Sequence, residues 1–377
     1  MCLMKIALLG HGTVGRGVVD IIDSGTGALE VSRILELPQF CNEARMTSNF
    51  DDIVEDDEID AVVEAMGGLE PAHGYIVRAL EAGKSVVTSN KAVVAEFFEE
   101  FVDAARANGA SLFIEATTGG GIPWIAGLMK VRRVDEVSSF SGIMNGTTNY
   151  IVDQMSRSGA EFGAVLERAQ GLGYAERDPS ADIDGIDVKN KTIISASVAF
   201  DVACTHDLPV SGIRNLTKAD LEFFASRGQS VRLLGKGVQE LGSYAVAVEP
   251  TAVDARSMEA AVPDNFNLLS CEGATIGPLK FYGQGAGSLP TGNAMVQDLL
   301  DLAAGVRPIY DFSRGLAYDP TLLSGDYLIR AAGFEPSGAE PAGAGYHRVP
   351  DITAEQARSL LDEALSVDPT AFMAAIG

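Results

Sequence analysis

The first forty residues alternate short apolar runs with glycine-rich and amphipathic segments. Residues 4–9 form the apolar run MKIALL, and residues 13–23 follow with apolar positions at helical spacing. A short apolar run that ends in a turn is typical of a buried parallel strand, and the second pattern predicts a helix packed on that strand. Residues 31–40, VSRILELPQF, predict a second strand.

The same alternation continues to about residue 130. AVVEAMGG at residues 61–68 and SVVTSNK at residues 85–91 are strand-like, and each is followed by a helical pattern. Strands that alternate with helices predict an α/β fold with a parallel sheet. We therefore predict a Rossmann-type, doubly wound domain over residues 1–130, with ligands bound at the carboxyl ends of its strands.

Between residues 131 and 283 the pattern changes to a mixture of strands and helices. Residues 134–144 (VDEVSSFSGIM) and 243–250 (SYAVAVEP) are strand-like, whereas residues 190–204 (NKTIISASVAFDVAC) have a helical pattern. This mixture predicts a second domain of the α+β class.

A glycine motif joins the first strand to the first helix. Gly10, Gly12 and Gly15 stand in the order G-x-G-x-x-G between a strand and a helix. In this setting the first glycine permits a tight turn, the second lets the backbone approach a pyrophosphate, and the third allows close helix packing. The free N–H groups of the helix N-terminus favour a phosphate. The motif predicts a bound dinucleotide; the alternative is a glycine-rich turn without a ligand.

The identity of the dinucleotide depends on the end of the second strand. An acidic residue at that point favours a free ribose 2′-hydroxyl, as in NAD. Glu36 is the candidate; Arg33 lies upstream of it, and no Lys or Arg follows it directly. The sequence therefore favours NAD over NADP.

The segment from Gly171 to Lys191, GLGYAERDPSADIDGIDVKNK, carries the candidate chemistry. Asp187 and Lys191 are four residues apart, so on a helix both side chains leave the same face. Glu176 could reach that face from the preceding loop. An ammonium paired with a carboxylate, beside another carboxylate that holds a cationic group, suits proton transfer with an amino-acid substrate. The alternative is an ordinary surface ion pair.

Seven motifs together resemble the homoserine dehydrogenase family over roughly residues 4 to 310. In chain order they are GHGTVGRGVV, AMGGLEPA, VVTSNKAVVA, EATTGGGIP, SGIMNGTTNYI, GLGYAERDPSADIDGIDVKNK and YGQGAGSLPTGNAMVQDLL. The resemblance implies reversible interconversion of L-homoserine and L-aspartate 4-semialdehyde with NAD or NADP, in threonine and methionine biosynthesis.

The resemblance also implies roles for single residues. Lys191 matches the catalytic lysine, Asp187 its carboxylate partner, and Lys91 a second lysine at the reaction centre; for Lys91 the alternative is a solvated residue at a loop. A lysine can take the substrate's hydroxyl proton if burial or another cation lowers its pKa. The implied substrate-binding residues are Glu176, Asp187, Gly146 and Thr147. For the segment that contains Gly146 and Thr147 the alternative is capping of a helix by Thr or Asn. The implied cofactor-binding residues are Gly10, Gly12, Thr13, Val14, Gly15, Glu36, Met66, Gly67, Ser89, Lys91 and Gly285.

A metal site is implied by resemblance at residues 114–123, IEATTGGGIP. Alkali cations prefer oxygen ligands. The implied ligands of a sodium or potassium ion are the Glu115 carboxylate and the carbonyls of Thr118, Gly120 and Ile122. The remaining candidates for a transition metal are scattered along the sequence and form no close ligand pair. They are His11, His73, His206, His347, Cys2, Cys41, Cys204 and Cys271.

The last hundred residues divide into two parts. The resemblance implies that residues 284–312 return to the nucleotide domain. For the segment around Gly285 the alternative is a loop that needs glycine only for its backbone angles. The resemblance also implies that the preceding residues, 131–283, bind substrate and form the dimer. Residues 326–377 predict a strand-like start, a Gly/Pro/Ala linker and one helix. This tail is short for the regulatory domain of many relatives, which needs two helices and four strands.

Composition limits the remaining possibilities. The chain has 377 residues and a formal net charge of −24, which argues against partners such as nucleic acid or anionic membranes. No apolar run is long enough to span a bilayer, and the N-terminus is already the first strand, so we expect a cytoplasmic protein. The resemblance implies a homodimer or higher homo-oligomer. A non-catalytic dinucleotide sensor of the same fold is the alternative. It has no need of a proton shuttle, and the presence of the four candidate residues disfavours it: Lys91, Glu176, Asp187 and Lys191.

Overall fold

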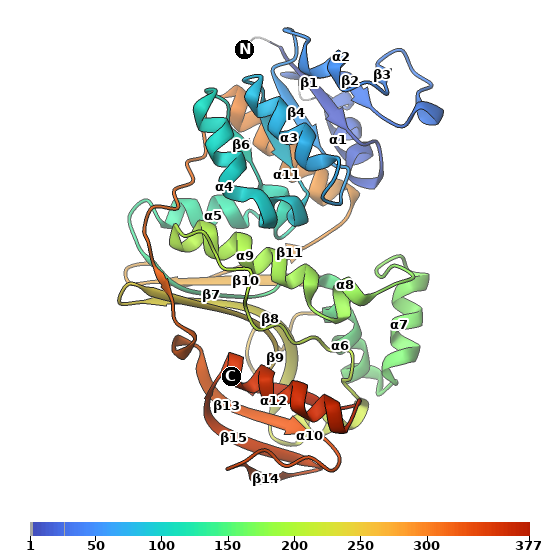
Figure 1. The fold of residues 1–377 in the computed structure, drawn as a ribbon. Coiled ribbons are helices and arrows are strands. Elements are labelled where there is room, and N and C mark those ends of the chain that lie inside the picture. The colour runs from blue at the N-terminus through green and yellow to red at the C-terminus, as the bar shows by residue number, and fades with distance from the viewer. Residues whose placement is uncertain (1–2, 26) are drawn as a thin grey trace. The chain divides into compact units, whose positions relative to one another are not determined.

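The computed structural model describes residues 3–25 and 27–377, so Cys2 lies outside the described residues (Figure 1). The chain forms two compact units. The first comprises Met1–Gly127 and Gln284–Ser313, and the second comprises Leu128–Gly283 and Arg314–Gly377. Both units are therefore discontinuous in sequence.

The first unit contains a six-stranded sheet in the order β3-β2-β1-β4-β5-β6, and all of its neighbours are parallel. The order reverses between β1 and β4, where doubly wound sheets bind ligands. The predicted Rossmann-type sheet is confirmed. Its strands are β1 (Met4–Leu9), β2 (Leu29–Leu35), β3 (Met46–Thr47), β4 (Ala61–Glu64), β5 (Ser85–Thr88) and β6 (Leu112–Phe113).

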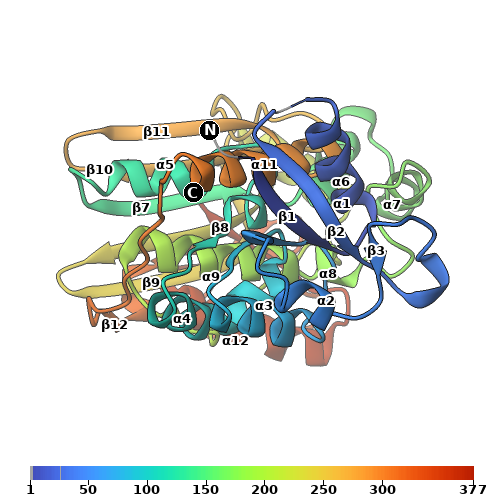
Figure 2. The same cartoon turned by 90° about the horizontal axis from the view of Figure 1, so that it is seen from above.

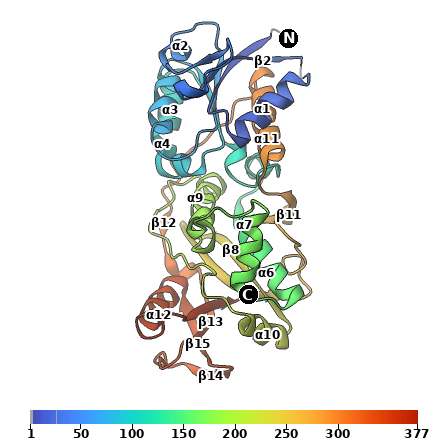
Figure 3. The same ribbon diagram turned by 90° about the vertical axis from the view of Figure 1, so that its right-hand side faces the viewer.

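Helices cover both faces of this sheet. On one face α1 and α11 lie side by side (Figure 3), because Gly17 and Gly292 let the two backbones approach. A Cβ on Gly17 would lie 2.4 Å from the carbonyl oxygen of Ser288. The unit's helices are α1 (Thr13–Asp23), η1 (Pro38–Phe40), α2 (Asp51–Val54), α3 (Ala72–Glu81), α4 (Lys91–Ala107), η2 (Glu115–Thr117) and α11 (Ser288–Ala303). Another helix, α5 (Trp124–Val131), contains the division between the units.

The second unit contains a mixed ten-stranded sheet. Its order is β11-β10-β7-β8-β9-β16-β13-β15-β14, with β12 beside β9; Figure 2 shows β11, β10 and β7 together at one edge. The predicted strands around residues 137–143 and 243–250 are confirmed. The strands are β7 (Val137–Ile143), β8 (Gln229–Glu240), β9 (Ser243–Asp254), β10 (Phe266–Gly273), β11 (Gly277–Gln284), β12 (Ala317–Tyr318), β13 (Ser324–Arg330), β14 (Glu340–Gly343), β15 (Tyr346–Thr353) and β16 (Phe372–Ile376).

Helix α9 is the most buried helix of the second unit. From Thr192 to Phe200 every residue is buried, as expected of a helix packed on several sides. It lies against β7, β8 and β9. The unit's helices are α6 (Gly146–Ser158), α7 (Phe162–Gly171), α8 (Ser180–Ile183), α9 (Ile186–Phe200), α10 (Lys218–Ser226), η3 (Pro320–Leu322) and α12 (Ala354–Val367). Among the described residues, no helix is long and apolar enough to cross a bilayer.

The C-terminal tail contains the predicted strand-like start, as β13, and the predicted helix, as α12, but it forms more strands than the sequence predicted. It contributes β13, β14, β15 and β16 to the ten-stranded sheet, and α12 is the only α-helix among the described residues 314–377. Both β15 and β16 pair antiparallel with β13, so they are parallel to each other and α12 joins them. This is a split βαβ unit. The prediction of a linker over residues 333–345 was wrong at residues 340–343, which form β14, because strand pairing, a non-local interaction, organised a segment of weak strand propensity.

Candidate functional site

Residues 10–15, here called the glycine turn, have the backbone geometry that the motif predicts. Gly10 has a φ of +90°, and a Cβ on Gly15 would lie 2.1 Å from the carbonyl oxygen of Gly10. A Cβ on Gly12 would meet nothing within 4 Å. Gly12 also caps α1, with no side-chain hydrogen bond to the helix N-terminus. Thr13 and Val14 begin that helix, so its first N–H groups provide an anion site.

Glu36 lies directly after β2 and is tied to the glycine turn. Its Oε1 accepts the N–H of His11 at 2.8 Å, and its Oε2 accepts the N–H of Leu37 at 3.0 Å. The carboxylate is thus held beside the first turn of the cofactor motif. A carboxylate in this place suits a ribose hydroxyl and repels a 2′-phosphate.

The other predicted cofactor residues of this unit lie after β4 and β5. A Cβ on Gly10 would lie 3.1 Å from the Met66 side chain, so Met66 borders the glycine turn. Gly67 follows with a φ of +78°. Ser89 follows β5, and Lys91 is the first residue of α4. The parallel sheet therefore gathers these residues at the carboxyl ends of its central strands.

Gly285 lies against the turn that contains Gly120. A Cβ on Gly120 would come within 2.5 Å of the Gly285 carbonyl carbon, and the N–H of Gly121 donates to the Gln284 carbonyl at 3.2 Å. Gly285 is buried. The two glycine segments thus meet within the first unit although they are 165 residues apart in sequence.

Glu115 is a buried carboxylate whose oxygens accept the N–H groups of Ile125 at 2.9 Å and Ala126 at 2.7 Å, in the first turn of α5. Burial raises its pKa to about 7. The N–H of Glu115 donates to Asp298, itself a buried acid with a raised pKa, chiefly because of burial. The buried hydroxyl of Thr118 has no hydrogen-bond partner among the described residues.

These groups fit a monovalent cation. Each carboxylate oxygen of Glu115 has a second lone pair beyond its N–H donor, and a cation would offset the burial of negative charge. The described residues contain no cluster of three His, Cys, Asp or Glu side chains that could hold a metal ion. The implied site therefore relies on backbone carbonyls, those of Thr118, Gly120 and Ile122.

The Lys191 cluster is the central feature of the second unit. We use this name for Lys191, Asp187, Asn145 and Asp182 with the carbonyl of Met144. The Lys191 ammonium donates to the Met144 carbonyl at 2.6 Å and to Asp187 Oδ2 at 2.8 Å. Both residues are only 7% exposed, so the alternative of a surface ion pair was wrong.

Sequence reasoning missed two members of the cluster. The Asn145 side-chain amide donates to Asp187 Oδ2 at 2.9 Å and to Asp182 Oδ1 at 2.7 Å, while its Oδ1 caps α6 through Thr148. Burial and the nearby Asp187 raise the pKa of Asp182. The signal available in the sequence was Asn145 at a helix start, where asparagine is favoured.

Two of the predicted substrate residues, Gly146 and Thr147, directly follow Asn145 of this cluster. A Cβ on Gly146 would lie 2.6 Å from the Asn265 carbonyl oxygen, so only glycine fits there. The Thr147 hydroxyl donates to the Tyr174 carbonyl at 2.5 Å and tethers the loop between α7 and α8. Glu176 is exposed on that loop. Gly146 and Thr147 therefore have structural contacts, whereas the Glu176 side chain faces solvent.

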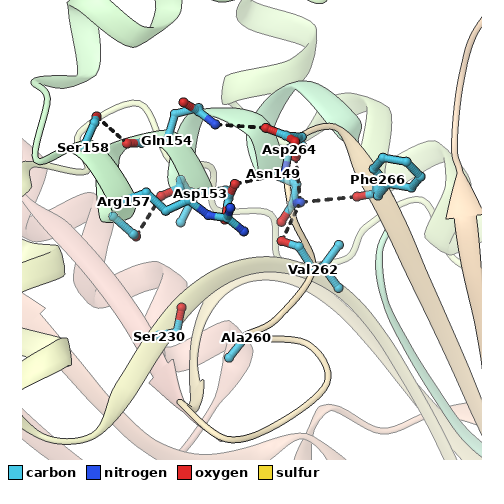
Figure 4. A network of polar contacts seen from close by, with 12 residues as sticks. Asn149, Asp153, Gln154, Arg157, Ser158, Ser230, Ala260, Val262, Asp264 and Phe266 are labelled. Carbon is cyan, nitrogen blue, oxygen red and sulfur yellow. Dashed lines mark hydrogen bonds and ion pairs between the residues drawn. The ribbon is translucent and has the colours of Figure 1, made fainter.

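A polar network anchors α6, the helix that begins at this cluster (Figure 4). The Asn149 amide donates to the carbonyls of Val262, Asp264 and Phe266 at 3.3, 2.8 and 3.3 Å. Asp153 accepts the N–H of Asp264 at 2.9 Å. The network fixes α6 against residues 262–266 and so fixes Asn145 at its start.

Comparison with known proteins decides the family. Residues 123–300 match the family model described as homoserine dehydrogenase, and residues 10–115 match the homoserine dehydrogenase NAD-binding domain. A homoserine dehydrogenase of Synechocystis sp. is 38% identical over an alignment of 342 residues that covers 85% of this chain and 77% of the relative. The chain belongs to the homoserine dehydrogenase family. The Bacillus subtilis member is 33% identical over 81% of this chain and 74% of its own length.

Solved structures of the family have the same fold. Homoserine dehydrogenase from Thiobacillus denitrificans aligns with a TM-score of 0.86 at 29% identity and covers 99% of this chain and 98% of its own. A hyperthermophilic archaeal homoserine dehydrogenase in complex with NADPH aligns with a TM-score of 0.71 at 25% identity, over 81% of this chain and 99% of its own.

Proposed function

We propose that this protein interconverts L-homoserine and L-aspartate 4-semialdehyde with a nicotinamide dinucleotide. The observation that carries the proposal is the buried Lys191–Asp187 pair, in a chain of the homoserine dehydrogenase family. A buried lysine held by a carboxylate is positioned to donate a proton as the ammonium and to accept one as the neutral amine, and this reaction needs both.

The proposed proton path begins at the homoserine hydroxyl. The hydroxyl proton passes to neutral Lys191 as hydride leaves the carbinol carbon. In the reverse direction the Lys191 ammonium polarises the aldehyde oxygen and then protonates the developing alkoxide. Asp187 and the Met144 carbonyl orient Nζ, and Asn145 orients Asp187. When bound, the nicotinamide supplies the hydride acceptor.

The remaining substrate and cofactor roles are part of the proposal. Glu176 binds the substrate ammonium, Gly146 and Thr147 line the substrate site, and Lys91 contributes a second cation to the reaction. Residues of the glycine turn hold the pyrophosphate, since the N-terminus of α1, which has no side-chain capping hydrogen bond, favours an anion. The other cofactor contacts proposed are Glu36, Met66, Gly67, Ser89 and Gly285.

We propose NAD as the preferred cofactor. Glu36 supports NAD because its carboxylate, fixed by the N–H groups of His11 and Leu37, would repel a 2′-phosphate. We also propose that a sodium or potassium ion binds at Glu115 with the carbonyls of Thr118, Gly120 and Ile122. There it would neutralise buried charge.

The cellular context is proposed from the family and the composition. We propose that the enzyme acts in the cytoplasm, in threonine and methionine biosynthesis, as a homodimer or higher homo-oligomer. The net charge of −24 opposes binding to nucleic acid or to anionic membranes. Sedimentation equilibrium of the purified protein measures the oligomeric state.

The deciding experiment follows the absorbance of reduced nicotinamide as the purified protein acts on L-homoserine. NAD and NADP are tested in parallel, with sodium, potassium or choline as the cation. We expect turnover that is faster with NAD. A protein that binds dinucleotide but leaves homoserine unchanged would contradict the proposal and favour the non-catalytic sensor.

A further inference from the structure

A buried carboxylate, Glu64, stands at the end of β4 and has no role in the proposed chemistry. It is 0% exposed. Its Oε1 accepts the N–H groups of Met66 at 2.8 Å and Gly67 at 3.3 Å, and its Oε2 accepts the hydroxyl of Thr88 at 2.5 Å. Glu64 therefore fixes the loop after its own strand and contacts the end of the neighbouring strand, β5.

The hydrogen bonds continue from Thr88 to the start of α4. Thr88 Oγ1 accepts the N–H of Asn90 at 3.0 Å. The Asn90 side chain caps α4 by accepting the N–H of Val93 at 3.3 Å, and its amide donates to the Gly68 carbonyl at 2.7 Å. The bonds thus form a closed ring that joins the loop after β4 to the loop after β5.

This ring surrounds residues to which the proposed function assigns the cofactor. The N–H groups of Met66 and Gly67 donate to Glu64, which fixes the backbone at these two residues. Lys91 directly follows Asn90, the residue that caps α4. We propose that Glu64, acting through Thr88 and Asn90, is a positioning residue that sets the direction of Lys91 for hydride transfer. The inference rests on the proposed function, because Lys91 has this role only in a dehydrogenase.

Both oxygens of Glu64 act as acceptors in this ring. The backbone N–H groups of Met66 and Gly67 and the hydroxyl of Thr88 all donate to the carboxylate oxygens of Glu64. Burial raises the pKa of Glu64, and the bond from Thr88 is the largest effect that opposes the rise. A glutamine would direct an NH₂ group at one of these donors, so an amide cannot reproduce the ring.

Thr88 offers the cleanest test because its size can be kept while its hydroxyl is removed. Thr88→Val removes both the donor to Glu64 and the acceptor of the Asn90 N–H, whereas Thr88→Ser keeps the hydroxyl. Ser85→Ala is the matched control: Ser85 lies at the other end of β5, where its buried hydroxyl accepts the Ser111 N–H at 3.1 Å. Each variant is made in the full-length protein, alone and with Lys91→Ala.

We expect Thr88→Val to lower kcat with homoserine about tenfold, with the Kd for reduced dinucleotide changed less than about threefold, as misplacement of one group predicts. Thr88→Ser should restore kcat, and Ser85→Ala should leave it unchanged. In the Lys91→Ala background, Thr88→Val should lower kcat by less than about twofold, because the effect of Thr88 on kcat acts through Lys91. A wild-type kcat in Thr88→Val, or its full effect without Lys91, would overturn the inference.

Hydrogen–deuterium exchange without dinucleotide gives a readout that is independent of activity. Thr88→Val should speed exchange at the N–H groups of Met66, Gly67 and Asn90, and Ser85→Ala should not. Unchanged exchange at these amides would also overturn the inference. If the wild type does not turn over homoserine but the exchange result is as expected, the proposed function is contradicted. The hydrogen-bonded ring through Glu64, Thr88 and Asn90 would still be supported.

Discussion

The glycine turn is built from backbone atoms of neighbouring residues, whereas the Lys191 cluster is built from side chains of separate segments. The glycine turn uses backbone atoms of six consecutive residues, and the roles of Gly10 and Gly15 follow from local geometry. The Lys191 cluster uses side chains from α8, from α9 and from the start of α6. The proposed pyrophosphate site is therefore local in sequence, whereas the candidate proton-transfer group depends on packing of distant segments.

The difference extends to tolerance of change. At the glycine turn the critical property is the absence of a Cβ, which no neighbouring residue can compensate. In the Lys191 cluster the charges of Lys191 and Asp187 compensate each other, and Asp182 is held by the Asn145 amide. Removal of one partner therefore leaves a buried charge or an unsatisfied polar group. The following predictions test this contrast, beginning with the largest effect.

Lys191→Ala should lower kcat by about a thousandfold, in the range expected for loss of a general acid or base. Dinucleotide binding should be unchanged, because the glycine turn is built without Lys191. Steady-state kinetics and a titration of reduced-nicotinamide fluorescence measure both quantities. Lys189→Ala, two residues earlier on α9, is the control and should behave as wild type; a Lys191→Ala enzyme with most of its kcat would contradict the assignment.

Gly12→Ala and Gly15→Ala should separate binding from folding within the glycine turn. A Cβ on Gly15 would lie 2.1 Å from the Gly10 carbonyl oxygen, so Gly15→Ala should lower the free energy of unfolding by about 1–3 kcal/mol. A Cβ on Gly12 meets no protein atom within 4 Å, so Gly12→Ala should keep the wild-type Tm. It should raise the KM for dinucleotide about tenfold by blocking the approach of the pyrophosphate. Equal losses of Tm would show that the two glycines have the same role.

Glu36→Ala should reduce the preference for NAD over NADP by about tenfold, which corresponds to about 1.4 kcal/mol of lost discrimination. The physical reason is removal of both a ribose acceptor and a negative charge. The ratio of kcat/KM for the two cofactors measures the effect. Glu30→Ala, on an exposed position of the same strand, provides a control for the loss of charge alone; a ratio unaffected by Glu36→Ala would place the discrimination elsewhere.

The last prediction concerns the pH and cation dependence of stability rather than catalysis. The pKa of Glu115 rises from its ordinary value of 4.5 to about 7. The folded state then binds more protons than the unfolded state, so the free energy of unfolding falls as pH rises from about 4.5 to 7, by on the order of 3 kcal/mol. Asp298, whose pKa is also raised, acts in the same direction.

A bound alkali cation should oppose this loss, because it favours the ionised carboxylate. At pH 8 we expect sodium or potassium to raise the Tm by a few degrees relative to choline, and at pH 5 the difference should be smaller. Glu115→Gln should reduce both the pH dependence and the cation effect. An equal response to sodium, potassium and choline in the wild type would contradict the cation site.

The C-terminal tail shows where sequence patterns were insufficient. The run around β14 is rich in Gly, Pro and Ala, which are poor strand formers, yet it pairs with β15. Tyr346 explains part of this order, because its hydroxyl donates to Asp220 at 2.6 Å and its ring stacks on Phe223 with centroids 4.4 Å apart. Arg330 also binds Asp220. These partners lie more than a hundred residues away in sequence, beyond the range of any local pattern.

The sequence by itself determined the parallel nucleotide-binding sheet, the glycine turn and the pairing of Asp187 with Lys191. Each depends on short-range geometry: alternation of strands and helices, glycine spacing, or one turn of helix. Only the tertiary structure decided that Lys191 is buried, that Asn145 and Asp182 complete its cluster, and that Glu64 links two loops through Thr88. Burial and hydrogen bonds of this kind depend on which distant segments pack together, and packing is a property of the whole fold.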